Sequence, residues 1–455
     1  MTNKMRMSVF ATAAVVAVFV VLGVGVTARA GSRITRLFFT NPSGVSESDF
    51  VAGGFDTSNA FFQVLGTNGR NCSSCHQPDQ GWTITPERTR ARFDASAGTD
   101  PIFRPVDGTV CPTADVSTLE ARRTAYNMLL TRGLIRISMA IPVNAEFQLV
   151  SVDDPYNCTN SSDIAMFRRP APATNLRFLS TVMWDGRESP KGRSLHDNLM
   201  SQALDATLGH AQAAVVPSQD QLESIVAFES SIYTAQVADK GAGSLTEAGV
   251  HGGPGELSSQ EFFIGINDPL GQNPSGAQFD PTVFRLYEKW GSGGRWSPAR
   301  QSIARGEQIF NTRPIAIEGV AGLNDVVGQS VIMGTCTTCH DSPNVGDHSV
   351  AAPLNIGIAD EARRTSDMPL YTFRCIATGE IYKVTDPGRA MLSGKCSDIG
   401  KFKGPVLRGL ASRPPYFHNG SAATLRDAVD FYDTRFNLGL TEQEKQDLVA
   451  FLQTL

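Results

Sequence analysis

The clearest pattern of apolar and polar residues lies at the C-terminus of the chain. A capping box that joins Thr441 to Glu444 precedes apolar residues spaced three and four apart, which places them on one face of a helix. The members of this face are Leu448, Phe451, Leu452 and Leu455. The pattern predicts a C-terminal helix that packs against the rest of the chain through this face.

Three further segments carry signals for the start of a helix. A capping box from Thr424 to Asp427 predicts one helix, and Ser297 followed by Pro298 predicts another, with proline in its first turn. Asp56 is expected to cap a third. No sustained alternation of apolar and polar residues predicts a large sheet, so the expected fold is mainly α with long loops.

The longest apolar run extends over residues 9–26. Two cations precede it, the small-residue site Ala28-Arg29-Ala30 follows it, and no acidic residue interrupts it. This is the pattern of a secretory signal peptide, so we expect residues 1–30 to be removed and the mature chain to lie in the bacterial periplasm. Because the run is slightly long for a signal peptide, an uncleaved membrane anchor is the alternative.

Length and composition set the expected domain organisation. The 455 residues favour at least two domains, and 41% hydrophobic residues is ordinary for a globular protein. A glycine-rich crossover at 266–296 is expected to separate an N-terminal domain at 31–265 from a C-terminal domain at 297–455. A net charge of -5 gives no indication of a nucleic-acid partner.

Two copies of Cys-x-x-Cys-His carry the strongest chemical signal. The first is Cys72-Ser73-Ser74-Cys75-His76 and the second is Cys336-Thr337-Thr338-Cys339-His340. In this spacing the two thiols bond to the vinyl groups of a haem and the histidine ligates its iron. A lone copy is also compatible with a redox dithiol or half of a zinc site, but two copies predict two covalently attached haem c groups, one in each domain.

Four cysteines lie outside these motifs. Their even number in an oxidising compartment favours disulfides. We expect Cys111 to pair with Cys158 and Cys375 with Cys396, each within its own domain. Sequence alone does not fix the pairing, and free buried thiols are the alternative.

Five stretches together resemble the bacterial di-haem cytochrome c peroxidases and the related MauG-type enzymes. They follow the order of that family and cover most of the mature chain. Besides the two haem motifs they are Met183-Trp184-Asp185-Gly186-Arg187, then Asp386-Pro387-Gly388-Arg389, and then Phe402-Lys403-Gly404-Pro405-Val406-Leu407-Arg408 leading to Pro415-Tyr416-Phe417-His418-Asn419-Gly420.

The resemblance implies a division of labour between the haems. The N-terminal haem, ligated by His76, becomes the peroxidatic site, and the C-terminal haem, ligated by His340, receives electrons from a donor. Trp184 becomes the candidate bridge between them. The family also implies a calcium ion between the domains, whose ligands the sequence does not place, and a homodimer.

The second haem has a candidate sixth ligand in Tyr432. This residue follows His418 by fourteen positions, where the resemblance implies methionine in the peroxidases and tyrosine in MauG-type enzymes. An anionic oxygen ligand lowers the potential of a haem and favours high-valent iron. A core aromatic on an amphipathic helix is the alternative. We expect His418 itself near the second haem or at the domain interface.

The first haem departs from the family pattern. Gln202 fits the expected glutamine, but the position of the expected glutamate falls near Gln212, and a neutral amide does not exchange the protons that peroxide cleavage requires. His210 suits that role because the reference pKa of histidine is about 6.5. An iron ligand or a solvated helix histidine are the alternatives. Residues 77–195 contain no histidine, so we expect an iron open to peroxide or oxygen.

Arg389 and Arg408 lie in motif positions and are expected to pair with haem propionates, because a guanidinium matches a carboxylate with two hydrogen bonds. Plain surface charges are the alternative.

These features predict a periplasmic di-haem oxidoreductase. It reduces hydrogen peroxide or another small oxidant at the first haem, with electrons from a small cytochrome c or a cupredoxin entering through the second. Tyr432 favours a MauG-like oxidase of an organic or protein substrate as an alternative. The missing glutamate favours an electron-transfer cytochrome without peroxidase activity, and a zinc or dithiol protein remains if no haem attaches.

Overall fold

The computed structural model describes residues 34–158 and 163–455. The expected signal peptide or anchor therefore lies outside the described residues. Within those two ranges, no helix is both long and apolar enough to cross a membrane.

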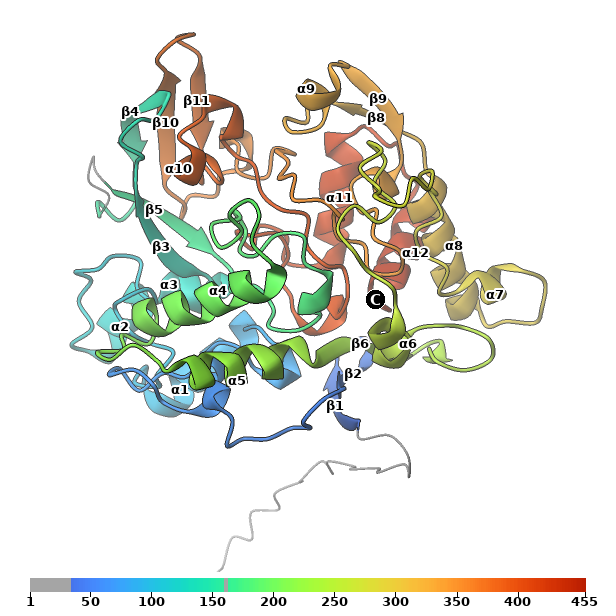
Figure 1. Ribbon diagram of the computed structural model, residues 1–455, viewed down its shortest axis with the longest axis horizontal. Coiled ribbons are helices and arrows are strands. Elements are labelled where there is room, and N and C mark those ends of the chain that lie inside the picture. The colour runs from blue at the N-terminus through green and yellow to red at the C-terminus, as the bar shows by residue number, and fades with distance from the viewer. Residues whose placement is uncertain (1–33, 159–162) are drawn as a thin grey trace, which may run out of the picture.

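The N-terminal strands form an antiparallel sheet with a segment far along the chain. β1 (Thr35–Asn41) and β2 (Gly44–Phe50) are joined by a short turn, and the sheet continues to β6 (Ile232–Asp239) and β7 (Gly243–Ser244). Figure 1 shows β1, β2 and β6 side by side in the lower part of the molecule.

Three smaller sheets are also antiparallel. β3 (Ile135–Ala140) pairs with β5 (Asp163–Arg168), and β8 (Ile315–Glu318) pairs with β9 (Val331–Gly334). β4 (Phe147–Asp153) pairs with β10 (Leu370–Cys375), which pairs with β11 (Ile381–Val384). β4 and β10 come from the two predicted domains, so these domains share a hydrogen-bonded sheet (Figure 1).

The helices gather in two groups on opposite sides of the molecule (Figure 1). The first group is α1 (Pro86–Ser96), α2 (Leu119–Ala125), α3 (Asn127–Arg132), α4 (Leu195–Gly209) and α5 (Gln219–Ser230). The second is α6 (Gly253–Ser259), α7 (Glu288–Gly291), α8 (Pro298–Thr312), α9 (Asn324–Val327), α11 (Leu425–Arg435) and α12 (Glu442–Leu452). The short α10 (Ala390–Ser393) lies beside the β10–β11 sheet.

The predicted helix starts are confirmed in the C-terminal half. Ser297 caps α8 with proline in its first turn, and Thr424 and Thr441 form capping boxes at α11 and α12. α8 and α12 pack together, with Phe310 and Phe451 in contact at a ring-centroid distance of 5.8 Å.

The helix expected after Asp56 is wrong. The Asp56 carboxylate accepts hydrogen bonds from the backbone and hydroxyl of Ser58, which closes a local turn. The only regular element there is a single 3-10 turn, Ala60–Phe62, capped by Asn59.

The expectation of a mainly α fold underestimates the strand content, because the described residues contain eleven strands. β2 shows why the sequence hides them. Its polar residues Ser46 to Asp49 are all buried, so the strand lacks the alternation of apolar and polar residues that predicts a strand. Their burial is compensated partly by hydrogen bonds, such as the one of 2.8 Å between the hydroxyls of Ser48 and Thr234 on β6.

Both predicted disulfides are confirmed. Cys111 and Cys158 are joined with an S–S distance of 2.10 Å, and Cys375 and Cys396 with one of 2.07 Å. The four cysteines of the haem motifs form no disulfide. The pairing therefore leaves free thiols where the attachment of haem requires them.

The stretch at 266–296, predicted to be a crossover, is largely irregular apart from α7. It also contributes to the core around α8 and α12, because Phe284, Tyr287 and Trp290 are fully buried there. The glycine-rich composition thus describes its backbone and not its packing.

Candidate haem-binding cavities

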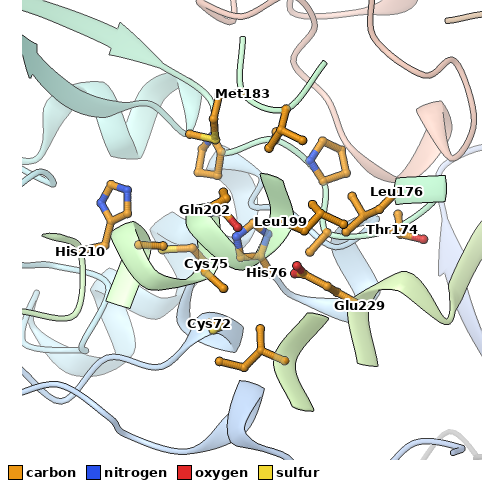
Figure 2. A pocket seen from close by; sticks show the side chains of 18 of the residues that line it. Cys72, Cys75, His76, Thr174, Leu176, Met183, Leu199, Gln202, His210 and Glu229 are labelled. Carbon is orange, nitrogen blue, oxygen red and sulfur yellow. The ribbon is translucent and has the colours of Figure 1, made fainter. Parts of the chain in front are cut away.

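The first Cys-x-x-Cys-His motif opens into a cavity that is partly open to solvent. Cys72 begins a 3-10 turn, and the His76 backbone N–H bonds back to the Cys72 carbonyl at 3.0 Å. This turn presents both thiols and the imidazole to one space. Figure 2 shows the three side chains in the pocket, together with Gln202, His210 and Glu229.

The His76 ring is oriented by a backbone carbonyl. Its Nδ1 lies 3.0 Å from the Trp82 carbonyl oxygen, an acceptor, so Nδ1 carries the proton and Nε2 is free. Burial lowers the pKa of His76, which favours the neutral form that a metal ligand needs.

The second motif repeats this arrangement in a cavity of similar size. The Nδ1 of His340 lies 2.6 Å from the Gly346 carbonyl oxygen, and burial lowers the pKa of His340. Cys336 and Cys339 line the same space, as do residues of α11 and α12. The two cavities are thus alike in size, in thiol placement and in imidazole orientation.

Tyr432 lies in the second cavity with His340. Its ring stacks against Phe436, the C-terminal cap of α11, with centroids 6.2 Å apart. Burial raises the pKa of its hydroxyl, and the neighbouring thiols of Cys339 and Cys336 act in the same direction. A bound metal cation opposes this shift and favours the phenolate.

Trp184 lines both cavities. Its indole Nε1–H donates to the Arg169 carbonyl at 2.8 Å, which fixes the ring, and the ring centroid lies 6.3 Å from that of His418. The structure therefore places this tryptophan in the wall that the two cavities share.

A buried ionic cluster joins the motif that contains Trp184 to the Asp-Pro-Gly-Arg motif. Arg168, at the end of β5, donates to Asp386 through Nε at 2.7 Å and Nη2 at 2.9 Å, and it also pairs with Asp185. Burial alone raises the pKa of Asp185, but the charges of Arg168 and Arg187 outweigh it and lower that pKa to about 2.

His418 is buried and lines the second cavity, and its nearness to a second haem stays a prediction. It stacks on Phe402 with centroids 3.8 Å apart and lies 3.6 Å from the Asp386 carboxylate. Burial lowers the pKa of His418 to about 4, so the imidazole is neutral at neutral pH.

Gln202 and His210 both line the first cavity from α4 and its C-terminal cap. The Nδ1 of His210 lies 2.6 Å from the Asp107 carboxylate, and Asp107 also accepts two hydrogen bonds from Arg70, at 2.7 and 2.8 Å. Gln212, at the position where the family resemblance implies a glutamate, does not line this cavity. Its side-chain oxygen instead accepts a hydrogen bond from the Asn68 amide at 3.2 Å.

Sequence reasoning missed Glu229, which lines the first cavity from α5. Burial raises its pKa to about 8, and Oε1 has no hydrogen-bond partner among the described residues. A signal was present in the sequence, because Glu229 follows Ile225 by four residues and thus falls on the apolar face of this helix.

The two arginines expected at propionates differ in position. Arg408 is buried and lines the first cavity, where it donates to the Asn344 and Gly253 carbonyls at 3.2 and 3.3 Å. Arg389 lines neither cavity, and its contact with the Asp185 carbonyl is long, at 3.4 Å.

The side chains around both cavities fit a covalently attached haem. Each cavity holds two free thiols and a neutral histidine with an available Nε2. Buried cations without carboxylate partners, such as Arg408, are suited to propionates, because an unpaired buried charge is costly. Across residues 34–158 and 163–455, no three His, Cys, Asp or Glu side chains are grouped to hold a metal ion, and the expected calcium ion stays a prediction.

Comparisons with known proteins point to peroxidases, although no protein-family model matches the chain. It is 33% identical over 132 residues to the cytochrome-c peroxidase IdrP2 of Denitromonas iodatirespirans, which covers 27% of this chain and 36% of that protein. It is 29% identical over 136 residues to the cytochrome c551 peroxidase of Nitrosomonas europaea, which covers 29% of this chain and 34% of that protein. The chain thus spans about a third of the length of these curated relatives.

A solved structure is also similar over most of its length. It is a MauG-like protein associated with microbial copper homeostasis, 17% identical, with a TM-score of 0.41 over 92% of this chain and 93% of that one. The peroxidase matches by themselves support the resemblance to cytochrome c peroxidases, over about a quarter of the chain.

Proposed function

We propose that the protein is a periplasmic di-haem c oxidoreductase that reduces hydrogen peroxide at the first cavity with electrons delivered through the second. The observation that carries this proposal is the pair of matched Cys-Cys-His cavities with Trp184 in their common wall. When bound, the haems supply the iron redox chemistry, one at the oxidant and one at the electron donor. The peroxidases among the relatives support the same class of reaction.

The first cavity supplies groups that exchange protons. Peroxide cleavage requires a base for one oxygen and an acid for the other. His210 holds its Nδ1 proton against Asp107, which leaves Nε2 to accept a proton. Glu229 is protonated at neutral pH because burial raises its pKa to about 8, so it serves as the acid. Gln202 contributes an amide that orients the oxidant.

Trp184 is proposed to connect the two cavities for electron transfer. Its ring is held by the hydrogen bond to the Arg169 carbonyl, and the adjacent Asp185 is fixed by Arg168. The donor is a small periplasmic cytochrome c or a cupredoxin, and the homodimer and the calcium ion expected from the family belong to the same proposal.

Tyr432 favours a second candidate, a MauG-like oxidase of an organic or protein substrate. Its position in the cavity of His340 is suited to an oxygen ligand of the second iron. An oxidase of this kind consumes peroxide with an organic or protein substrate as the reductant, without a small electron donor.

The test uses the secreted protein from a host that assembles cytochromes c. Haem content is measured first, and then the peroxide-dependent oxidation of a reduced small cytochrome c. We expect two haems per chain, turnover by the wild type, and at least tenfold slower turnover by Trp184→Phe with its haems retained. A protein with two haems that consumes no peroxide with any donor contradicts the proposal, and peroxide consumption that occurs only with an organic or protein substrate favours the oxidase.

A further inference from the structure

Three cations lie in the wall between the two cavities. Arg169, Lys403 and Arg413 each line both the first and the second cavity. The two arginines are buried, and Lys403 is partly buried. They come from separate parts of the chain, so the fold brings together positive charges that the sequence keeps up to 244 residues apart.

None of the three forms an ion pair with a carboxylate in the described part of the chain, although the Asp347 carboxyl acts on Lys403 at longer range. Within the described ranges no Asp or Glu oxygen lies within 4.0 Å of them, in contrast to Arg168 nearby, which pairs with two aspartates. Their hydrogen bonds go to backbone carbonyls instead. Arg169 donates to Arg413 at 2.8 Å, Lys403 to Thr181 at 2.9 Å and Arg413 to Val406 at 2.6 Å.

The guanidinium groups also keep unused donors. The Nε atoms of Arg169 and Arg413 are buried without a hydrogen-bond partner among the described residues. Carbonyl acceptors do not neutralise a full charge, and unpaired buried cations are costly in a folded protein. Burial lowers the pKa of Lys403 to about 8 and that of Arg169 to about 9, and the charge of Arg413 adds to the effect on Arg169. An anion that enters both cavities removes this cost.

We propose that Arg169, Lys403 and Arg413 form one anion-binding site shared by the two cavities, which binds a propionate from each haem and couples the reduction potentials of the two haems. This inference rests on the two covalent haems proposed above. Each haem carries carboxylates, and guanidinium groups bind carboxylates with paired hydrogen bonds. A cation beside a haem favours the reduced iron, since reduction adds a negative charge.

The shared position makes a distinctive prediction. If each cation served one haem, its removal would change one potential. Because the three cations line both cavities, the loss of any one of them is expected to lower the midpoint potentials of both haems. A substitution that keeps the charge, such as Arg413→Lys, is expected to leave both potentials close to those of the wild type.

The experiment is a spectroelectrochemical titration of the haem-loaded protein. Lys403→Gln and Arg413→Gln are compared with the wild type, with Arg413→Lys as the charge-conserving variant and Lys383→Gln as the control, since Lys383 is exposed and pairs with Glu361. We expect both haems of each Gln variant to show a tenfold higher ratio of oxidised to reduced iron at a fixed potential, equal to a shift of about 59 mV for one electron. The control should show no shift.

Two results overturn the inference while the proposed function stands. They are a shift confined to one haem, and potentials that do not move in either Gln variant, each in a protein that carries two haems. A haem assay precedes the titration and separates this failure from the other one, because a wild-type protein without two covalent haems contradicts the proposed function itself. If Arg413→Gln does not fold, Lys403→Gln decides the matter, since it removes a charge from the less buried of these residues.

Discussion

Replacement of Arg168 by methionine is expected to destabilise the protein strongly. Arg168 is the only cation in contact with Asp386 among the described residues, and it shares Asp185 with Arg187. Arg168, Asp185 and Asp386 are all buried. Methionine retains much of the volume of the side chain and removes its charge, so two carboxylates are left in the interior with little compensation.

The magnitude follows from the structure. The pKa of Asp185 falls from 3.8 to about 2, which corresponds to roughly 2 kcal/mol of net favourable interaction at neutral pH. The two hydrogen bonds to Asp386 add to this value. Removal of one partner of a buried ion pair costs about 3–5 kcal/mol, and we expect a loss in this range for Arg168→Met.

The assay is urea unfolding of the haem-loaded protein followed by far-UV circular dichroism. The matched control is Arg285→Met, which removes an exposed ion pair with Asp280 at 2.7 Å and is expected to cost less than about 1 kcal/mol. A depressed carboxyl pKa stabilises the fold above pH 3.8 and loses that effect as the pH falls towards 2, so the deficit of Arg168→Met should shrink in acid. An Arg168→Met protein as stable as the control variant at pH 7 would refute the reasoning.

Three further substitutions test the cavities. The wild type should lose stability, of the order of 5 kcal/mol, as the pH rises from 4.5 to about 8, because Glu229 keeps its proton in the folded state and releases it in the unfolded state. Glu229→Gln should not show this loss. The prediction fails if urea unfolding gives both proteins the same change in stability between pH 5 and pH 8. Tyr432→Phe should change the spin state of the ferric second haem and raise its potential, and an unchanged room-temperature spectrum would identify a core aromatic. His210→Ala should slow peroxide turnover by roughly 10²-fold or more with both haems retained, whereas His196→Ala, an exposed histidine on the same helix paired with Glu223, should not; equal rates in the two variants would assign the proton transfer elsewhere.

Local signals in the sequence predicted the elements whose stability is local. The capping boxes at Thr424 and Thr441 and the proline after Ser297 mark helix starts because they satisfy backbone donors within one turn. The disulfide Cys375–Cys396 links residues only 21 positions apart, and the pairing was expected because both lie within one predicted domain.

The sheets depend on partners far along the chain, and the sequence hides them. β4 pairs with β10, for example at Phe147 and Cys375. These residues are so far apart in the sequence that no local pattern of apolar and polar residues predicts their pairing. The buried polar residues of β2 have tertiary partners: Ser48 bonds to Thr234 on β6, and Glu47 and Asp49 pair with Arg36 on β1. In the sequence the strand therefore looks like an ordinary polar segment. The prediction of a mainly α fold came from this absence of alternation.

The candidate site divides in the same way. Residues in motifs, such as His76, His340 and Trp184, were found because a short pattern carries their chemistry. Glu229 and the shared cations were missed because their significance lies in where tertiary packing places them. Arg169 and Arg413 are ordinary charges in the sequence and become unusual only when the fold buries both without a carboxylate.

The proposed function of both cavities requires covalent haem at both Cys-x-x-Cys-His motifs. The decisive measurement is the intact mass of the purified secreted protein, together with its pyridine haemochromogen spectrum, after expression in a host that assembles cytochromes c. The predicted result is a mass equal to the mature chain plus two haems, with two haems per chain in the spectrum. A colourless protein with the mass of the bare chain would contradict the assignment of both cavities.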